Sequence, residues 1–153
     1  GATLIGQKVA DVFESDKTSF GAIGHGYTYS GHPVGCAAGL AALAETKRLK
    51  LNENAAARGQ ELQRALAALK EKYEVLGDFR GRGLMAGLEL VADRETKQPL
   101  DQKAMERVAD TAYDAGIMIR VTGNLIILSP PLIITSADLD RIADGLDAGL
   151  AAA

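Results

Sequence analysis

The sequence predicts a mixed α/β chain, in which long helices are followed by a small α+β unit with a mostly antiparallel sheet covered by helices. The residues at positions 84, 86, 88 and 90 are apolar and alternate with their neighbours, as in a strand with one buried face. Two short apolar segments, at 117–121 and 125–129, flank a Gly-Asn turn. Helical periodicity with capping residues occurs between and after these segments. From residue 84 onward, the predicted order is strand, helix, strand, strand, helix.

Composition excludes several classes of partner. The 153 residues are 47% apolar and 24% charged, with a formal charge of −3 and no long basic run, so nucleic acid and anionic membranes are poor partners. No apolar stretch approaches the length of a membrane span. The single cysteine, Cys36, excludes an internal disulfide framework and fits a reducing compartment, so a cytoplasmic location is expected. His25 and His32 are the only histidines and no CxxC accompanies them, so no metal site is predicted.

The first 50 residues contain two predicted helices. The apolar residues of segment 5–14 recur at helical spacing. Residues 34–49 form a second helix rich in Ala and Gly, and Pro33 suits its first turn because a missing N–H costs nothing there. Small side chains let another backbone approach closely. That backbone could belong to a partner segment or subunit, and burial of the helix within one subunit is equally consistent.

A third helix should end near residue 73 and begin at a cap provided by Asn52 or Asn54. Its apolar residues Leu62, Leu66 and Leu69 share one helix face. Three glycines in residues 75–83 break any helix, and the strand at 84–91 follows them. A charged loop then leads to the fourth helix.

Capping residues define the last two helices. Asp101 is expected to cap a helix that Gly116 terminates. Residues 122–124 have the length of a hairpin loop, with a Gly and an Asn to adopt positive φ. Two prolines stop the second strand of this hairpin, and Thr135 or Ser136 starts the final helix.

The loop at residues 24–33 is polar, contains both histidines, and leads directly into the helix at 34–49. A loop rich in glycine and hydroxyl groups at a helix N-terminus offers backbone N–H groups and a positive dipole end, which suit an anion. A long surface loop that simply ends in a helix explains the same residues. Composition alone favours this simpler interpretation.

Four motifs along the chain are weak singly and specific together. They are Gly1-Ala2-Thr3, Gly26-Tyr27-Thr28-Tyr29-Ser30-Gly31-His32-Pro33, Arg80-Gly81-Arg82-Gly83-Leu84-Met85, and Leu128-Ser129-Pro130-Pro131-Leu132-Ile133-Ile134-Thr135. With these motifs the chain resembles the C-terminal part of a class III, fold-type I aminotransferase, a family that depends on pyridoxal phosphate. The resemblance covers essentially the whole chain.

The resemblance implies a division of the chain and a cofactor-binding role for the loop. Residues 1–50 would end the large cofactor-binding domain, and residues 51–153 would form the C-terminal small domain. Thr28 would bind the cofactor phosphate of the other subunit in a homodimer or larger assembly. The backbone N–H of Thr28 or of Tyr27 would help, since a hydroxyl and amides at a helix entry suit a phosphate.

No catalytic residue is expected within the chain. By the resemblance, the Schiff-base lysine and the aspartate that pairs with the pyridine nitrogen would lie upstream of Gly1. Lys8 and Lys17 do not match the lysine motif and lie in polar stretches, as solvated lysines do. The apolar start of the chain lacks an initiator methionine. The chain is therefore expected to be a fragment of a longer protein and to have no transaminase activity alone.

Arg120 is the expected substrate-binding residue. It ends a predicted strand, where an arginine beside a cleft can bind a carboxylate at two points, although a strand-end arginine more commonly points at water. In the family, members that act on ω-amino acids and amines with pyruvate carry an Arg-x-x-Gly pattern, which residues 120–123 match. Members resembling ornithine and acetylornithine aminotransferases place the arginine in the second strand, where this chain has Ile127.

The resemblance thus implies the C-terminal region of a transaminase that moves an amino group from an ω-amino acid or amine to pyruvate or another oxo acid. Two alternatives stay open. One is a racemase, aminomutase or decarboxylase on the same fold, because fold does not determine chemistry. The other is a non-catalytic α+β module for binding or dimerisation. A lysine upstream of Gly1 in the coding sequence would distinguish an enzyme from such a module.

Overall fold

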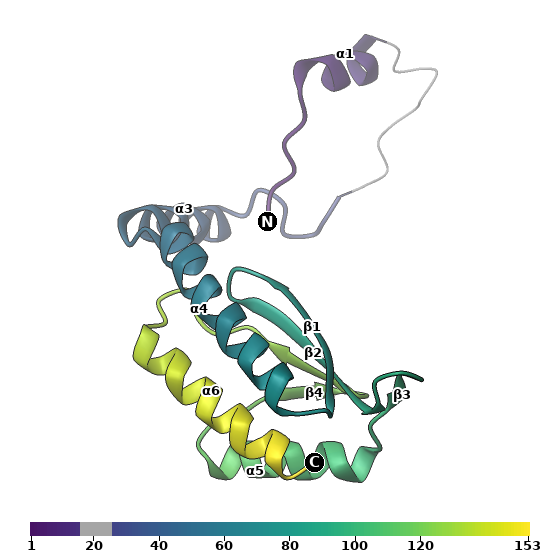
Figure 1. The fold of residues 1–153 in the computed structure, drawn as a ribbon. Helices are drawn as coiled ribbons and strands as arrows, with labels where there is room; N and C mark the ends of the chain where they lie inside the picture. Colours follow the sequence, from purple (N-terminus) through teal and green to yellow (C-terminus); the bar gives the residue numbers. More distant parts are fainter. Residues whose placement is uncertain (16–25) are drawn as a thin grey trace. The chain divides into compact units, whose positions relative to one another are not determined.

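The computed structural model describes residues 1–15 and 26–153, which form two compact units, Gly1–Thr46 and Lys47–Ala153. The first unit contains α1 (Gln7–Ser15) and nearly all of α3 (Pro33–Arg48). The second unit contains the sheet and the remaining helices (Figure 1). In the described parts of the chain, no helix is both long and apolar enough to cross a bilayer.

The first unit is helical but has little core of its own. Pro33 is the first residue of α3, as its fixed φ predicts. Neither α1 nor α3 contains a buried residue. The apolar side chains of Leu40 and Leu43 on α3 are 70% and 68% exposed. The helix therefore presents its small residues and its leucines on an open surface.

The second unit contains an antiparallel sheet, which confirms the predicted small α+β architecture. The path of neighbouring strands is β1-β2-β5-β4, and a short β3 also pairs with β2. Every strand pair is antiparallel. The strands are β1 (Leu76–Arg82), β2 (Met85–Asp93), β3 (Gln98–Pro99), β4 (Arg120–Thr122) and β5 (Leu125–Leu128).

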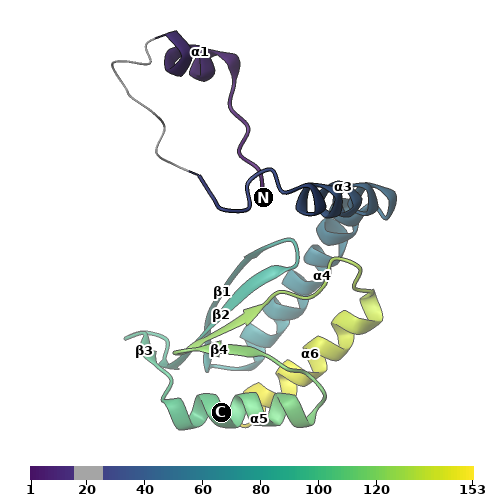
Figure 2. The same cartoon turned by 180° about the vertical axis from the view of Figure 1, so that it is seen from behind.

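Helices cover one face of this sheet. Figures 1 and 2 show α4 (Leu51–Lys72) and α6 (Ser136–Ala151) on the same side of the strands, with α5 (Gln102–Asp114) packed against α6. The predicted apolar face of α4 is buried, and so are the alternating residues of β2. The core includes Leu62, Leu66 and Leu69 from α4, Ala86, Leu88 and Leu90 from β2, Ile126 and Leu128 from β5, Met105 and Val108 from α5, and Leu139, Leu146 and Leu150 from α6.

The predicted ends of α5 and α6 are confirmed. The Asp101 side chain accepts a hydrogen bond from the backbone N–H of Ala104, and Gly116 follows α5 with a φ of +88°. At α6, Thr135 and Asp138 form a reciprocal capping box. The Thr135 hydroxyl and backbone N–H hold the pKa of the Asp138 carboxyl below its usual value.

The predicted cap of α4 is wrong. The helix begins at Leu51, after Lys50 in the left-handed conformation with a φ of 51°, and no side chain caps it. Asn54 lies inside the helix. Its side-chain amide donates to the carbonyls of Leu132 at 2.7 Å and Ile134 at 3.0 Å. Asn54 therefore fixes the segment after β5, a role that depends on a contact about 80 residues away in the chain.

Two strand predictions and one turn prediction also need correction. The glycine-rich segment before residue 84 forms β1, which glycine spacing alone did not indicate. The segment predicted as a strand at 117–121 pairs only from Arg120 onward, so Arg120 begins β4 and does not end a strand. In the turn between β4 and β5, Gly123 has a φ of +60°, whereas Asn124 does not adopt positive φ.

Candidate functional site

The predicted phosphate loop forms consecutive turns directly before α3. The backbone N–H of Ser30 donates to the Tyr27 carbonyl at 3.0 Å, and that of His32 donates to the Tyr29 carbonyl at 3.1 Å. Gly31 has a φ of +71°, a conformation that favours glycine. Gly24 and His25 of the predicted loop lie outside the described residues.

His32 caps α3 with its side chain. Its Nδ1 accepts from the backbone N–H of Gly35 at 3.2 Å, and its ring makes an edge contact with the Tyr29 ring, with the centroids 5.7 Å apart. The hydrogen bond to Gly35 places the His32 ring at the junction of loop and helix. It also satisfies one of the N–H groups of the first helical turn.

Thr28 retains the donors that an anion would need. The backbone N–H of Tyr27 donates to Ser30 Oγ at 3.3 Å, so the Tyr27 amide already has a partner. Thr28 is exposed, and among the described residues neither its hydroxyl nor its N–H has a hydrogen-bond partner. A free hydroxyl and amide close to a helix N-terminus fit a phosphate group. Within this loop, Thr28 is therefore a better candidate than Tyr27, and both roles stay predictions.

Arg120 begins β4 and lies directly opposite Ile127 of β5. Cross-strand partners project from the same face of a sheet, with Cβ atoms about 4.5–5.5 Å apart. The two positions that the resemblance gives for a substrate-binding arginine, 120 and 127, are thus neighbours on one face. Gly87 of β2 pairs with Ile127 on its other side, and Arg80 of β1 pairs with Gly87. These four residues form one row across the face of the sheet opposite α4 and α6.

The two arginines of this row differ in their partners. Arg80 contacts the carboxylates of Glu89 at 3.2 Å and Asp78 at 3.4 Å, so its charge is compensated. Arg120 is exposed and has no carboxylate partner in the part of the chain that the structure describes. A guanidinium without a protein partner can bind an external carboxylate at two points.

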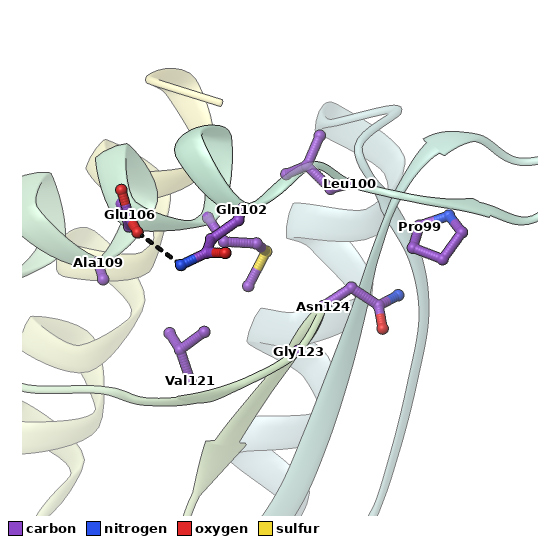
Figure 3. A pocket seen from close by; sticks show the side chains of 9 residues that line it. Pro99, Leu100, Gln102, Glu106, Ala109, Val121, Gly123 and Asn124 are labelled. Carbon is purple, nitrogen blue, oxygen red and sulfur yellow. Dashed lines mark hydrogen bonds between the residues drawn. The ribbon is translucent and has the colours of Figure 1, made fainter.

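A separate pocket of about 620 Å³ lies between α5 and the turn that joins β4 to β5 (Figure 3). Met105 and Val121 contribute apolar side chains to it. On the α5 side of the pocket, the Gln102 side-chain amide donates to the Glu106 carboxylate at 2.9 Å. None of the predicted site residues lines this pocket. In the described ranges, no cluster of three or more His, Cys, Asp or Glu could hold a metal ion.

The structure places the predicted site residues in two units. Thr28 and Tyr27 are adjacent in the first unit, and Arg120 belongs to the second. Gly87 was not among the predicted site residues, although a glycine inside an alternating apolar strand is a recognised signal of close approach. Only the strand register relates Gly87 to Arg120.

Comparison with known proteins identifies the family and the fold of the chain. The family model described as aminotransferase class-III matches residues 1–150. An amine transaminase from an uncultivated Pseudomonas species, solved in its PLP-bound form, superposes with a TM-score of 0.89 and is 45% identical in sequence. The match covers 97% of this chain and 34% of that one.

Two curated relatives have nearly the same sequence identity to this chain. The diaminobutyrate–2-oxoglutarate transaminase of Halomonas elongata is 38% identical over 143 residues, which are 91% of this chain and 30% of that protein. The hypotaurine/taurine–pyruvate aminotransferase of Paracoccus denitrificans is 39% identical over 127 residues, 76% of this chain and 28% of that protein.

The chain spans about a third of the length of the curated relatives it matches. Its structural similarity to an amine transaminase confirms the expected fold, that of a fold-type I aminotransferase. The match of the family model extends over nearly every residue, including the loop that carries Thr28 and the hairpin that carries Arg120. This chain belongs to the class III aminotransferase family.

Proposed function

We propose that the complete enzyme transfers an amino group from an ω-amino acid or amine to pyruvate or another oxo acid. The observation that carries this proposal is the Arg120 guanidinium, exposed and without a carboxylate partner among the described residues, beside the apolar Ile127. Pyridoxal phosphate is the cofactor that membership of the family indicates, and a PLP-bound amine transaminase is among the similar structures.

The residues of this chain bind and orient groups in the proposed reaction. The cofactor, when bound, stabilises the negative charge that develops on the carbon bearing the amino group. Thr28 would hold its phosphate, and in a homodimer that phosphate would belong to the partner subunit. Arg120 would hold the carboxylate of the oxo acid and would move aside for an amine that has none.

Relatives of similar identity differ in the oxo acid that their names give, so the residues of this chain support the choice of acceptor. One is named for 2-oxoglutarate and the other for pyruvate. The arginine at position 120, together with Ile127 in place of a second arginine, favours the branch that uses amines and pyruvate. We further infer that residues 1–50 and 51–153 correspond to two domains of the complete enzyme, and that it is cytoplasmic.

We expect Arg120→Ala in the complete enzyme to raise the KM for pyruvate about ten- to a hundredfold. A carboxylate that loses a charge-assisted, two-point contact loses roughly 1.5–3 kcal/mol. The half-reaction with an amine that lacks a carboxylate should change much less, because such a donor has nothing for the guanidinium to bind. Single-turnover kinetics of the two half-reactions separate these effects.

Arg82→Ala is the matched control for this experiment. Arg82 is also exposed, is the last residue of β1 and pairs with Met85, outside the row that contains Arg120. We expect it to leave the KM for pyruvate unchanged. Equal losses in both half-reactions of Arg120→Ala would show that Arg120 supports the fold and does not recognise the carboxylate.

We expect Thr28→Ala in the complete enzyme to weaken cofactor binding about ten- to a hundredfold. One charge-assisted hydrogen bond to a phosphate contributes roughly 1.5–3 kcal/mol. Equilibrium titration with pyridoxal phosphate, followed by absorbance, measures this change. Thr46→Ala is the control, because the Thr46 hydroxyl donates to the Ala42 carbonyl within α3 and so has an internal role. Unchanged affinity in Thr28→Ala would exclude the loop as the phosphate site.

We expect the 153-residue chain alone to form no alanine from pyruvate and an amine in the presence of pyridoxal phosphate. Among its residues, neither Lys8 nor Lys17 matches the lysine motif that the reaction requires. Chromatographic measurement of alanine, against a reaction with cofactor alone, tests this expectation. Alanine above that background would show that a lysine of this chain can act as the Schiff-base residue.

A further inference from the structure

We propose that Gly87 determines how large an amine substituent the complete enzyme accepts. The residue keeps a space open on the uncovered face of the sheet, beside Ile127 and close to Arg120. This proposal rests on the proposed function, because that function places the substrate at Arg120.

The strand register puts these residues in one row. Gly87 of β2 pairs with Ile127 of β5, and Ile127 pairs with Arg120 of β4. Partners in a row project from the same face, and neighbouring strands lie about 4.7–4.9 Å apart. Gly87 is therefore two strands, or roughly 10 Å, from the backbone of Arg120. Ile127 is half-buried between them.

Packing within the second unit does not require a glycine at position 87. An ideal Cβ built on Gly87 meets no atom within 4 Å, and the residue does not adopt positive φ. Gly77 in the adjacent strand differs, because a Cβ there would lie 2.7 Å from the Val91 side chain. A glycine inside a strand costs roughly 0.5–1 kcal/mol relative to alanine. Such a glycine often marks a place where a ligand or another backbone comes close.

The position of the space favours a ligand. An amine without a carboxylate must place an uncharged substituent where an oxo acid places its carboxylate, once Arg120 has moved aside. An uncharged substituent needs apolar contact and room. Ile127 provides apolar surface next to Arg120, and Gly87 provides room next to Ile127. The size of the residue at position 87 should therefore limit the size of the substituent.

Substitution of Gly87 in the complete enzyme tests this proposal. We expect Gly87→Val to lower kcat/KM for 1-phenylethylamine at least about tenfold relative to 2-aminopropane, because methyl-sized differences in an apolar site typically change rates by 10–200-fold. Gly87→Ala should act in the same direction by a smaller factor. The KM for pyruvate should stay the same in both variants. Ala92→Val adds the two carbons by which valine exceeds alanine, at an exposed position of β2 outside the row, and should leave the ratio of the two amines unchanged.

One outcome would overturn the proposal. It is an unchanged ratio of the two amines in a Gly87→Val variant that melts at the wild-type temperature, whether or not both values of kcat/KM fall. If Gly87→Val does not fold, the ratio in Gly87→Ala decides. Failure of the proposed function gives a different result. In that case, Arg120→Ala lowers the rates of both half-reactions equally. If Gly87→Val shows a size-dependent loss and Arg120→Ala lowers both half-reactions equally, the role of Gly87 in limiting substituent size would stand. The role of Arg120 in binding the carboxylate would be rejected.

Discussion

Replacing Gly59 by alanine is expected to lower the free energy of unfolding of the second unit by about 3 kcal/mol, because overpacking of a tight contact costs 1–3 kcal/mol or more. Gly59 is buried in the middle of α4. An ideal Cβ there would lie 2.5 Å from the Cα of Gly83 and 2.6 Å from its carbonyl oxygen. Both obstacles are backbone atoms, so no rotamer change can relieve the clash. Urea unfolding of the 153-residue chain, followed by circular dichroism, measures the loss.

The control is Gly39→Ala, which makes the same substitution inside another helix. A Cβ at Gly39 meets nothing within 4 Å, and alanine is the better helix former by roughly 0.8–1 kcal/mol. We therefore expect no loss of stability in that variant. Wild-type stability of Gly59→Ala would show that α4 and the turn between β1 and β2 are not in direct backbone contact.

Replacing Arg94 by alanine is expected to lower the free energy of unfolding by roughly 2–3 kcal/mol, since hydrogen bonds from a charged group contribute about 1.5–3 kcal/mol. The Arg94 guanidinium donates to carbonyls at the end of α4. Nη2 lies 2.8 Å from the Tyr73 oxygen and Nε lies 3.0 Å from the Glu74 oxygen. Nη2 also contacts the carbonyls of Lys70 and Leu76. A cation at a helix C-terminus interacts favourably with the dipole as well.

Two variants separate these contributions. Arg94→Lys keeps the charge but loses the planar fork of donors, and should recover only part of the stability. Arg64→Ala removes an exposed arginine on α4 and should change the stability by less than about 0.5 kcal/mol. The same urea transition reports all three variants. Equal stability of Arg94→Ala and Arg64→Ala would mean that the carbonyls are satisfied by water.

Local signals in the sequence predicted those parts of the fold whose cause is local. The caps of α5 and α6 were correct, because Asp101, Thr135 and Asp138 bond to backbone groups within three residues. The alternation in β2 was also correct, because a strand with one buried face repeats every two residues. The resemblance of the motifs to class III aminotransferases likewise needed no structure, and the family model confirms it.

Other features depended on residues distant in the chain. The glycines of β1 carry little strand propensity, and that strand exists because β2 supplies its hydrogen-bond partners. Asn54 looked like a cap, since an asparagine near a helix start commonly is one. It instead satisfies two carbonyls of the segment after β5. Helix propensity and capping rules do not include such contacts.

For the candidate site, the sequence by itself identified Thr28 and Arg120 as individual residues, through motifs and their chemistry. It did not determine which other residues share a surface with Arg120. That relation depends on strand register, in which pairing across β2, β5 and β4 aligns Gly87, Ile127 and Arg120 on one face. Register is set by the packing of the whole sheet, because a slip by one residue would exchange the two faces. Only the tertiary structure, therefore, could connect a glycine in one strand to an arginine 33 residues later.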